Sequence, residues 1–95
     1  MLSARAFYIE GLVQGVGFRH NTKLQASALG LCGSAVNLSD GRVYVEALGT
    51  DAALDALAKW LARGPRFARV DRLIAAALSA DAALKISTIG AFTTA

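Results

Sequence analysis

Three glycines fall within the seven residues from Gly11 to Gly17, and this cluster constrains the fold more than any other feature of the chain. Glycine reaches backbone angles that other residues avoid and lets neighbouring groups come close, so the cluster predicts a loop of special conformation. Alternating side chains predict a strand before this loop, over Ala4–Glu10. A helix is predicted after it, over Phe18–Leu29, with Gly30 as its C-terminal glycine.

A hairpin and a second helix are predicted next. Strands are expected over Cys32–Leu38 and Val43–Leu48, because a Ser-Asp-Gly turn at residues 39–41 separates two short apolar segments. The second helix follows Thr50, a suitable N-cap, and stops at Gly64, which precedes the single proline.

The last two elements are predicted to be strands, one over Val70–Ala77 and a weaker one over Leu84–Phe92 with a bulge at Gly90. The order βαββαβ with a short fifth strand predicts an α+β protein with a ferredoxin-like α/β sandwich, in which two helices cover one face of an antiparallel sheet. Residues 1–95 are assigned to a single domain. The residues predicted to face the core are Leu24, Ala28 and Leu29 on the first helix and Leu54, Leu57, Ala58 and Leu61 on the second.

The composition excludes disordered and membrane-spanning chains. The 95 residues are 55% hydrophobic and 18% charged, and no run approaches the roughly 20 apolar residues that span a bilayer. The one cysteine, Cys32, cannot form an internal disulfide, and the N-terminus has no apolar signal segment. These features predict a soluble, cytoplasmic protein, and a monomer is the default expectation. The net charge of +3 suits an anionic ligand but is too small to indicate nucleic acid by itself.

The glycine-rich loop has the features of an anion site. Glycines allow consecutive backbone N–H groups to converge, and the start of the following helix adds partial positive charge. Arg19, in the first turn of that helix, can hold two anion oxygens with its planar guanidinium. Phosphate fits better than carboxylate because there are more donors than two oxygens need. The alternative is that the glycines only shape a turn and that Arg19 is a solvated helix residue.

The segment Val13–Arg19, with the sequence VQGVGFR, resembles the signature of the acylphosphatase family. The resemblance covers about residues 4 to 75 and includes Leu29-Gly30-Leu31, Val36-Asn37, Asp40-Gly41-Arg42-Val43 and Gly64-Pro65 with Ala68 and Val70. It implies a ferredoxin-like enzyme that hydrolyses the carboxyl–phosphate bond of acyl phosphates to carboxylate and phosphate. The implied partners are a small acyl phosphate and inorganic phosphate, which is both product and inhibitor. From the residues themselves we expect no cofactor, metal, nucleic acid or membrane partner.

The resemblance also implies the site residues. Arg19 and Asn37 match the family's catalytic pair, in which the arginine binds the phosphoryl group and the asparagine positions the attacking water. An amide is a feeble base, so we expect orientation and charge stabilisation to dominate, with a substrate oxygen accepting the proton. Taken alone, Asn37 is more typical of a turn, because it stands just before the Ser-Asp-Gly segment. The substrate-binding residues implied by the loop are Gln14, Gly15, Val16, Gly17, Phe18 and Arg19.

The sequence gives little support to a cysteine nucleophile or to a metal site. A cysteine phosphatase needs an arginine shortly after its nucleophile, but Leu38 occupies that position relative to Cys32, which is predicted to be a buried strand residue. His20 is the only histidine, so no metal-ligand spacing exists, and it is expected to cap the loop or line its rim.

A non-catalytic ferredoxin-like module that binds an anion or RNA is the alternative function. Arginines recur every third residue across the second helix's end and the fourth strand, and RNA-recognition motifs share this fold. The aromatic residues available for stacking are few, namely Phe7, Tyr8 and Tyr44, so a solvated basic edge is the simpler interpretation. The four arginines are Arg63, Arg66, Arg69 and Arg72.

Two places depart from the family pattern. Ser34 stands after Gly33 where the family usually has an aromatic residue, which could be compensated by Trp60. The Ala-rich C-terminal stretch matches only loosely, so its strand register is open. Neither departure touches Arg19 or Asn37, and both therefore bear on stability before activity.

Overall fold

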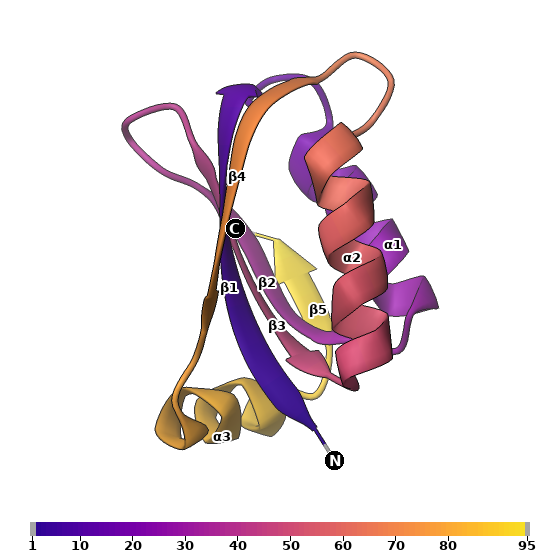
Figure 1. Ribbon diagram of the computed structural model, residues 1–95, viewed down its shortest axis with the longest axis vertical. Helices are drawn as coiled ribbons and strands as arrows, with labels where there is room; N and C mark the ends of the chain where they lie inside the picture. The colour runs from indigo at the N-terminus through magenta and orange to yellow at the C-terminus, as the bar shows by residue number, and fades with distance from the viewer. Residues whose placement is uncertain (1, 95) are drawn as a thin grey trace.

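The computed structural model describes residues 2–94 as a five-stranded sheet with helices on both faces (Figure 1). The elements are β1 (Ser3–Leu12), α1 (Phe18–Ala28), β2 (Cys32–Asn37), β3 (Val43–Gly49), α2 (Asp51–Arg63), β4 (Arg69–Ala77), α3 (Ala80–Ile89) and β5 (Phe92–Thr94). This confirms the predicted ferredoxin-like α/β sandwich with α1 and α2 on one face. Within residues 2–94, no helix is long and apolar enough to cross a membrane.

The strand order β4-β1-β3-β2-β5 brings the functional segments to one end of the sheet. Both β1 and β2 pair antiparallel with β3, so they run in the same direction on either side of it. Val43, at the start of β3, pairs with Ile9 on one side and with Asn37 on the other. The loop after β1 and the end of β2 therefore lie at the same edge.

Strand β1 extends beyond the predicted Glu10, so Gly11 belongs to a strand rather than to the loop. The register against β4 shifts between Glu10 and Gly11, where a β-bulge lets the two strands approach closely. A side chain at position 11 would collide with the carbonyl oxygen of Arg69, and the φ of Gly11 is 135°. Glycine at this position serves the strand pairing, not the loop.

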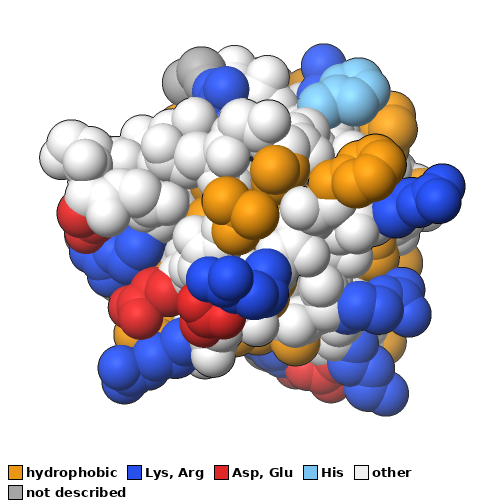
Figure 2. All heavy atoms as spheres, turned by 90° about the horizontal axis from the view of Figure 1, so that it is seen from above, with side chains coloured by type: hydrophobic (Ala, Val, Ile, Leu, Met, Phe, Trp, Pro, Cys, Tyr) orange, Lys and Arg blue, Asp and Glu red, His pale blue; other side chains and the backbone are white. Residues whose placement is uncertain are grey.

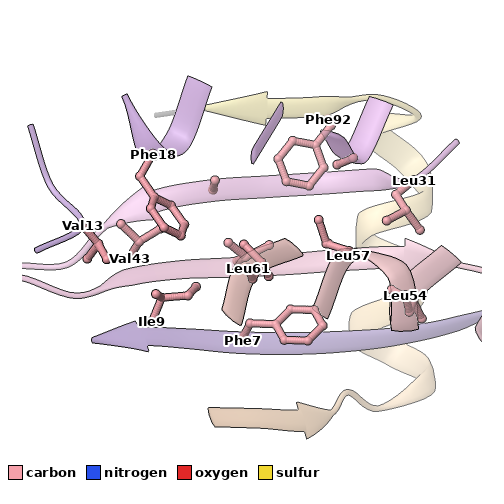
Figure 3. Close-up of a cluster of buried hydrophobic side chains, with 14 residues drawn as sticks. Phe7, Ile9, Val13, Phe18, Leu31, Val43, Leu54, Leu57, Leu61 and Phe92 are labelled. Carbon is pink, nitrogen blue, oxygen red and sulfur yellow. The ribbon is translucent and has the colours of Figure 1, made fainter. Parts of the chain in front are cut away.

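The core lies between the sheet and the helices α1 and α2. Phe7 and Ile9 of β1 meet Leu54, Leu57 and Leu61 of α2, and all five are fully buried (Figure 3). The predicted apolar stripe of α2 is thus correct, and Ala58 packs beside it.

The predicted core face of α1 is wrong except at its end. Leu24 is 53% exposed and Ala28 is exposed, whereas Leu29 packs against the core. The buried residues are instead Phe18, Thr22 and Ala26. Thr22 tolerates complete burial because its hydroxyl donates to the carbonyl of Phe18 at 2.8 Å.

The predicted fifth strand over Leu84–Phe92 is also wrong, because α3 occupies most of it. Ser79 caps this helix by accepting a hydrogen bond from the Ala82 amide, and Gly90 ends it with a φ of 71°. Alanine-rich sequence between two such signals favours a helix. Ile86 packs with Ala4 and Leu48 on the sheet face opposite α1 and α2.

The remaining strand, β5, is short and pairs in parallel with β2. The sheet is therefore mixed rather than wholly antiparallel. The predicted antiparallel arrangement holds for the other three strand pairs.

Ser34 points away from the face that Trp60 covers. Ala35 lies in the core under the helices, and strand alternation directs Ser34 to the other face, where Glu46 is its cross-strand partner. Trp60 packs on the helical side, with its ring centroid 5.9 Å from that of Phe18. Trp60 therefore does not fill the space of the missing aromatic residue.

Candidate active site

The loop between β1 and α1 contains two glycines in the left-handed backbone conformation. Gly15 and Gly17 each have a φ of 76°, a conformation costly for residues with a side chain. A Cβ at Gly15 would meet nothing within 4 Å, so backbone angle rather than space requires glycine there. The two turns direct the chain from the end of β1 into α1.

The start of α1 suits an anion. Helices α2 and α3 both begin with a hydroxyl cap and an acidic residue in the first turn. Helix α1 begins after Gly17, which has no side chain to cap the free amides, and its first turn contains Arg19 and His20 but no acidic residue. Basic residues at a helix N-terminus oppose the helix dipole, and a bound anion would relieve this conflict.

Arg19 and Asn37 line the same cavity. Its volume is about 130 Å³, and it is lined by Val13, Gly15, Gly17, Phe18, Arg19, His20 and Asn37. None of these residues is acidic, so the cavity favours a negatively charged ligand. Figure 2 shows the histidine and several Lys or Arg side chains on this face of the molecule, with a few acidic side chains away from the histidine.

Three of the predicted binding residues do not present their side chains to the cavity. The Phe18 ring is buried in the core, so its backbone is what remains for a ligand. Val16 packs against the core cluster and does not line the cavity. Gln14 is also absent from the lining, because its side-chain amide donates to the carbonyls of Leu38 and Arg42.

Two cavity residues were not among the predicted site residues. His20 was expected to cap the loop or line its rim, and it lines the cavity. Val13 is almost fully buried and forms part of the wall. An apolar residue at a strand end carries no sequence signal that distinguishes a cavity wall from ordinary core.

A larger depression, of about 420 Å³, lies beside the β2–β3 turn but suits phosphate poorly. Its lining includes Glu10, Asp40 and Arg42. Arg42 is already paired, with its Nε 2.8 Å from a carboxylate oxygen of Asp40. Hydrogen bonds from the backbone amide and guanidinium of Arg42 lower the pKa of Asp40, so this carboxyl stays ionised. The smaller cavity is therefore the better candidate for phosphate.

The residues that line the cavity include no cysteine and no acidic side chain that could bind a metal ion. Cys32 is half-buried at the opposite end of β2 from Asn37. Among residues 2–94, no three His, Cys, Asp or Glu side chains gather where they could hold a metal ion.

The three aromatic residues considered for RNA stacking are either buried or packed against other side chains. Phe7 is fully buried. Tyr8 lies across the strands from Tyr44, with ring centroids 4.8 Å apart, and the Arg42 guanidinium covers the Tyr8 ring. The four arginines of the basic edge are exposed, and Arg69 pairs with Asp71.

Known proteins resemble the chain in both sequence and structure. The sequence pattern of the family described as Acylphosphatase matches residues 5–85. An acylphosphatase of Yersinia pseudotuberculosis serotype O:1b is 52% identical over 68 residues, which are 70% of this chain and 74% of that protein. An acylphosphatase of Alkalilimnicola ehrlichii is 54% identical over 70 residues, covering 74% and 79% of the two chains.

A solved structure extends the likeness to the whole fold. The structure of an acylphosphatase from Coxiella burnetii superimposes with a TM-score of 0.88 at 28% sequence identity. The match covers 99% of this chain and 93% of that one. It therefore includes the end of α3 and β5, which lie beyond the family match at residues 5–85.

Proposed function

The chain belongs to the acylphosphatase family and is an enzyme of that class, and on this premise we propose that Arg19 and the loop amides hold the phosphoryl group while Asn37 orients the attacking water. The substrate is an acyl phosphate, and the products are a carboxylate and inorganic phosphate. The observation that supports these roles is that the glycine loop, Arg19 and Asn37 line one cavity without acidic side chains.

The loop and Arg19 supply charge stabilisation. Backbone amides from Gly15 to Arg19 donate to the phosphoryl oxygens, and the guanidinium of Arg19 adds two donors and a positive charge. In a loose phosphoryl transition state, negative charge remains on these oxygens, so donors fixed beforehand lower the barrier. The acyl carboxylate is a good leaving group and needs little protonation.

Asn37 supplies orientation. Its amide holds a water molecule by hydrogen bonds on the side of the phosphorus opposite the leaving carboxylate. Water attacks phosphorus, the carboxyl–phosphate bond breaks, and a substrate oxygen accepts the proton. An essential protein base in the pH–rate profile of kcat would contradict this proton transfer.

Catalysis in this proposal needs no metal or cofactor. Phosphate release from benzoyl phosphate should continue in excess EDTA, since the donors named are amides, a guanidinium and an asparagine. Loss of activity on chelation, restored by a divalent ion, would contradict it.

Anion binding is tested separately by an NMR titration with inorganic phosphate. The amide shifts should be centred on Gly15 to Arg19, and phosphate should inhibit competitively. Shifts centred on Arg63 to Arg72 would move the site to the basic edge.

We also propose that the protein is a monomer, that it lies in the cytoplasm and that it has no nucleic-acid partner. The single cysteine supports a reducing compartment, and light scattering checks the monomer. A salt-dependent mobility shift with single-stranded RNA at low micromolar protein would instead support the RNA-binding alternative.

A further inference from the structure

The two walls of the cavity come from strands that are not neighbours. The loop follows β1, Asn37 ends β2, and β3 lies between them. Two strand spacings separate the walls, a distance of about 10 Å. The relative placement of the two walls therefore depends on contacts that reach across the end of β3.

Gln14 makes such a contact. It lies between two cavity residues, Val13 and Gly15, and its Nε2 donates to the carbonyl of Leu38 at 2.8 Å and to that of Arg42 at 2.9 Å. Leu38 directly follows Asn37 in the chain. One half-buried side chain thus connects the centre of the loop to the turn that directly follows Asn37.

The carbonyls that Gln14 binds are themselves fixed. The Leu38 amide donates to the Arg42 carbonyl at 2.8 Å, and the Gly41 amide donates to the Leu38 carbonyl at 3.2 Å. Each carbonyl oxygen has two lone pairs, so it accepts one bond from the turn and one from Gln14. The glutamine therefore attaches the loop to a turn that is already closed.

Resting on the roles assigned to Arg19 and Asn37, we propose that the side chain of Gln14 is a positioning residue that sets the distance between the phosphate loop and the water held by Asn37. It acts through these two segments and does not touch the substrate. Both hydrogens of its amide are used, so neither Leu nor Glu of similar size can replace it, and Asn is one carbon too short.

The proposal predicts different effects on phosphate affinity and on kcat. Gln14→Leu leaves the glycine turns, the α1 amides and Arg19 in place, so phosphate should bind within about threefold of its original affinity. The water is misplaced relative to phosphorus, so kcat should fall about tenfold or more, since small displacements of reacting groups are costly. Gln14→Asn should behave like Gln14→Leu.

Gln25→Leu is the matched control. Gln25 is the only other glutamine and lies exposed on α1, outside the cavity lining. The same chemical change there should leave kcat and phosphate affinity unchanged. Thermal unfolding of each variant shows that assays are run on folded protein.

A double variant tests whether Gln14 acts through Asn37. If it does, adding Gln14→Leu to Asn37→Ala should lower kcat by less than about threefold beyond Asn37→Ala alone. A further fall equal to that of Gln14→Leu in the original chain would mean that the two residues act independently, and would overturn the proposal.

A role confined to stability would give a different result. Gln14→Leu would then lower the unfolding temperature while kcat stayed within about twofold of the original. That outcome contradicts positioning but leaves the roles of Arg19 and Asn37 intact. Unchanged kcat in Asn37→Ala would instead contradict the proposed function itself, so the two failures are distinguishable.

Discussion

The two ends of the sheet are held by different kinds of contact. At the cavity end, directional hydrogen bonds join segments far apart in sequence, such as those from Gln14 to the β2–β3 turn. At the other end, α3 is held by a small apolar cluster in which Ile86 meets Ala4 and Leu48. Hydrogen bonds between fixed partners specify positions, whereas apolar contacts mainly contribute burial. Changes at the cavity end should therefore affect chemistry first, and changes around α3 should affect stability first.

The largest expected effect is at Arg19. Arg19→Ala removes the charge and both donors in the ground and transition states, so phosphate binding should weaken and kcat/KM should fall about 10³-fold or more. Arg19→Lys should also be severe, because a point charge does not replace the planar guanidinium. Arg63→Ala, an exposed arginine outside the cavity, is the control and should change neither quantity. Benzoyl phosphate hydrolysis and phosphate inhibition measure both.

Asn37 should separate turnover from affinity. Asn37→Ala should reduce kcat about 10²-fold, the usual cost of losing one positioned hydrogen-bonding group, with phosphate affinity nearly unchanged. Circular dichroism must first establish that the variant is folded, since Asn37 adjoins the turn. Near-normal kcat in folded protein would require another group to position the water.

Ile86 tests the opposite end. Ile86→Ala removes a buried side chain from the α3 cluster and should lower the free energy of unfolding by about 2 kcal/mol, with kcat unchanged. Ile89→Ala is the matched control, because Ile89 is on the same helix and 57% exposed, and it should cost under about 0.5 kcal/mol. Denaturant titration gives both values. A large loss of kcat in stable Ile86→Ala protein would break the division between the two ends.

The smallest expected effect is a pH dependence of the β2–β3 turn. Because Arg42 lowers the pKa of Asp40 below 3.8 in the folded state, the Asp40 carboxylate stabilises the fold above that pH. This contribution is lost as the pH falls through the lowered pKa. Asp40→Asn should therefore be slightly less stable than the original chain at pH 7, and the difference should shrink in acid. Unfolding midpoints at pH 7 and pH 3 compare them, and a difference that grew in acid would contradict the assignment.

The loop at the cavity end could be predicted from the sequence, whereas the α3 segment at the other end could not. Gly15 and Gly17 meet a backbone requirement that few residues meet, so the loop could be predicted, whereas its anion binding through Arg19 stays a prediction. The α3 segment was misread because Ile86 and Ile89 favour strands, although Ser79 and Gly90 bracket a helix.

Two further details depended on packing that a local pattern does not contain. The buried face of α1 uses Thr22 and Ala26, and a threonine faces the core only because the helix backbone accepts its hydrogen bond. The bonds of Gln14 join positions 24 and 28 residues apart. The periodic pattern of apolar residues along the chain does not predict contacts of this kind.

The parallel pairing of β5 with β2 has a consequence for the order of folding. The strand that carries Asn37 has an open edge until a segment from the end of the chain reaches it, since Thr93 and Gly33 are 60 positions apart. Closing so long a loop is slow, and three residues of pairing hold it weakly, so β5 should detach more readily than the central strands. The Gly33 amide, which donates to the Ala91 carbonyl at 3.0 Å, reports this opening. In hydrogen exchange it should lose protection well before the amides of β3, and the exposed edge would then be the place where one chain pairs with another.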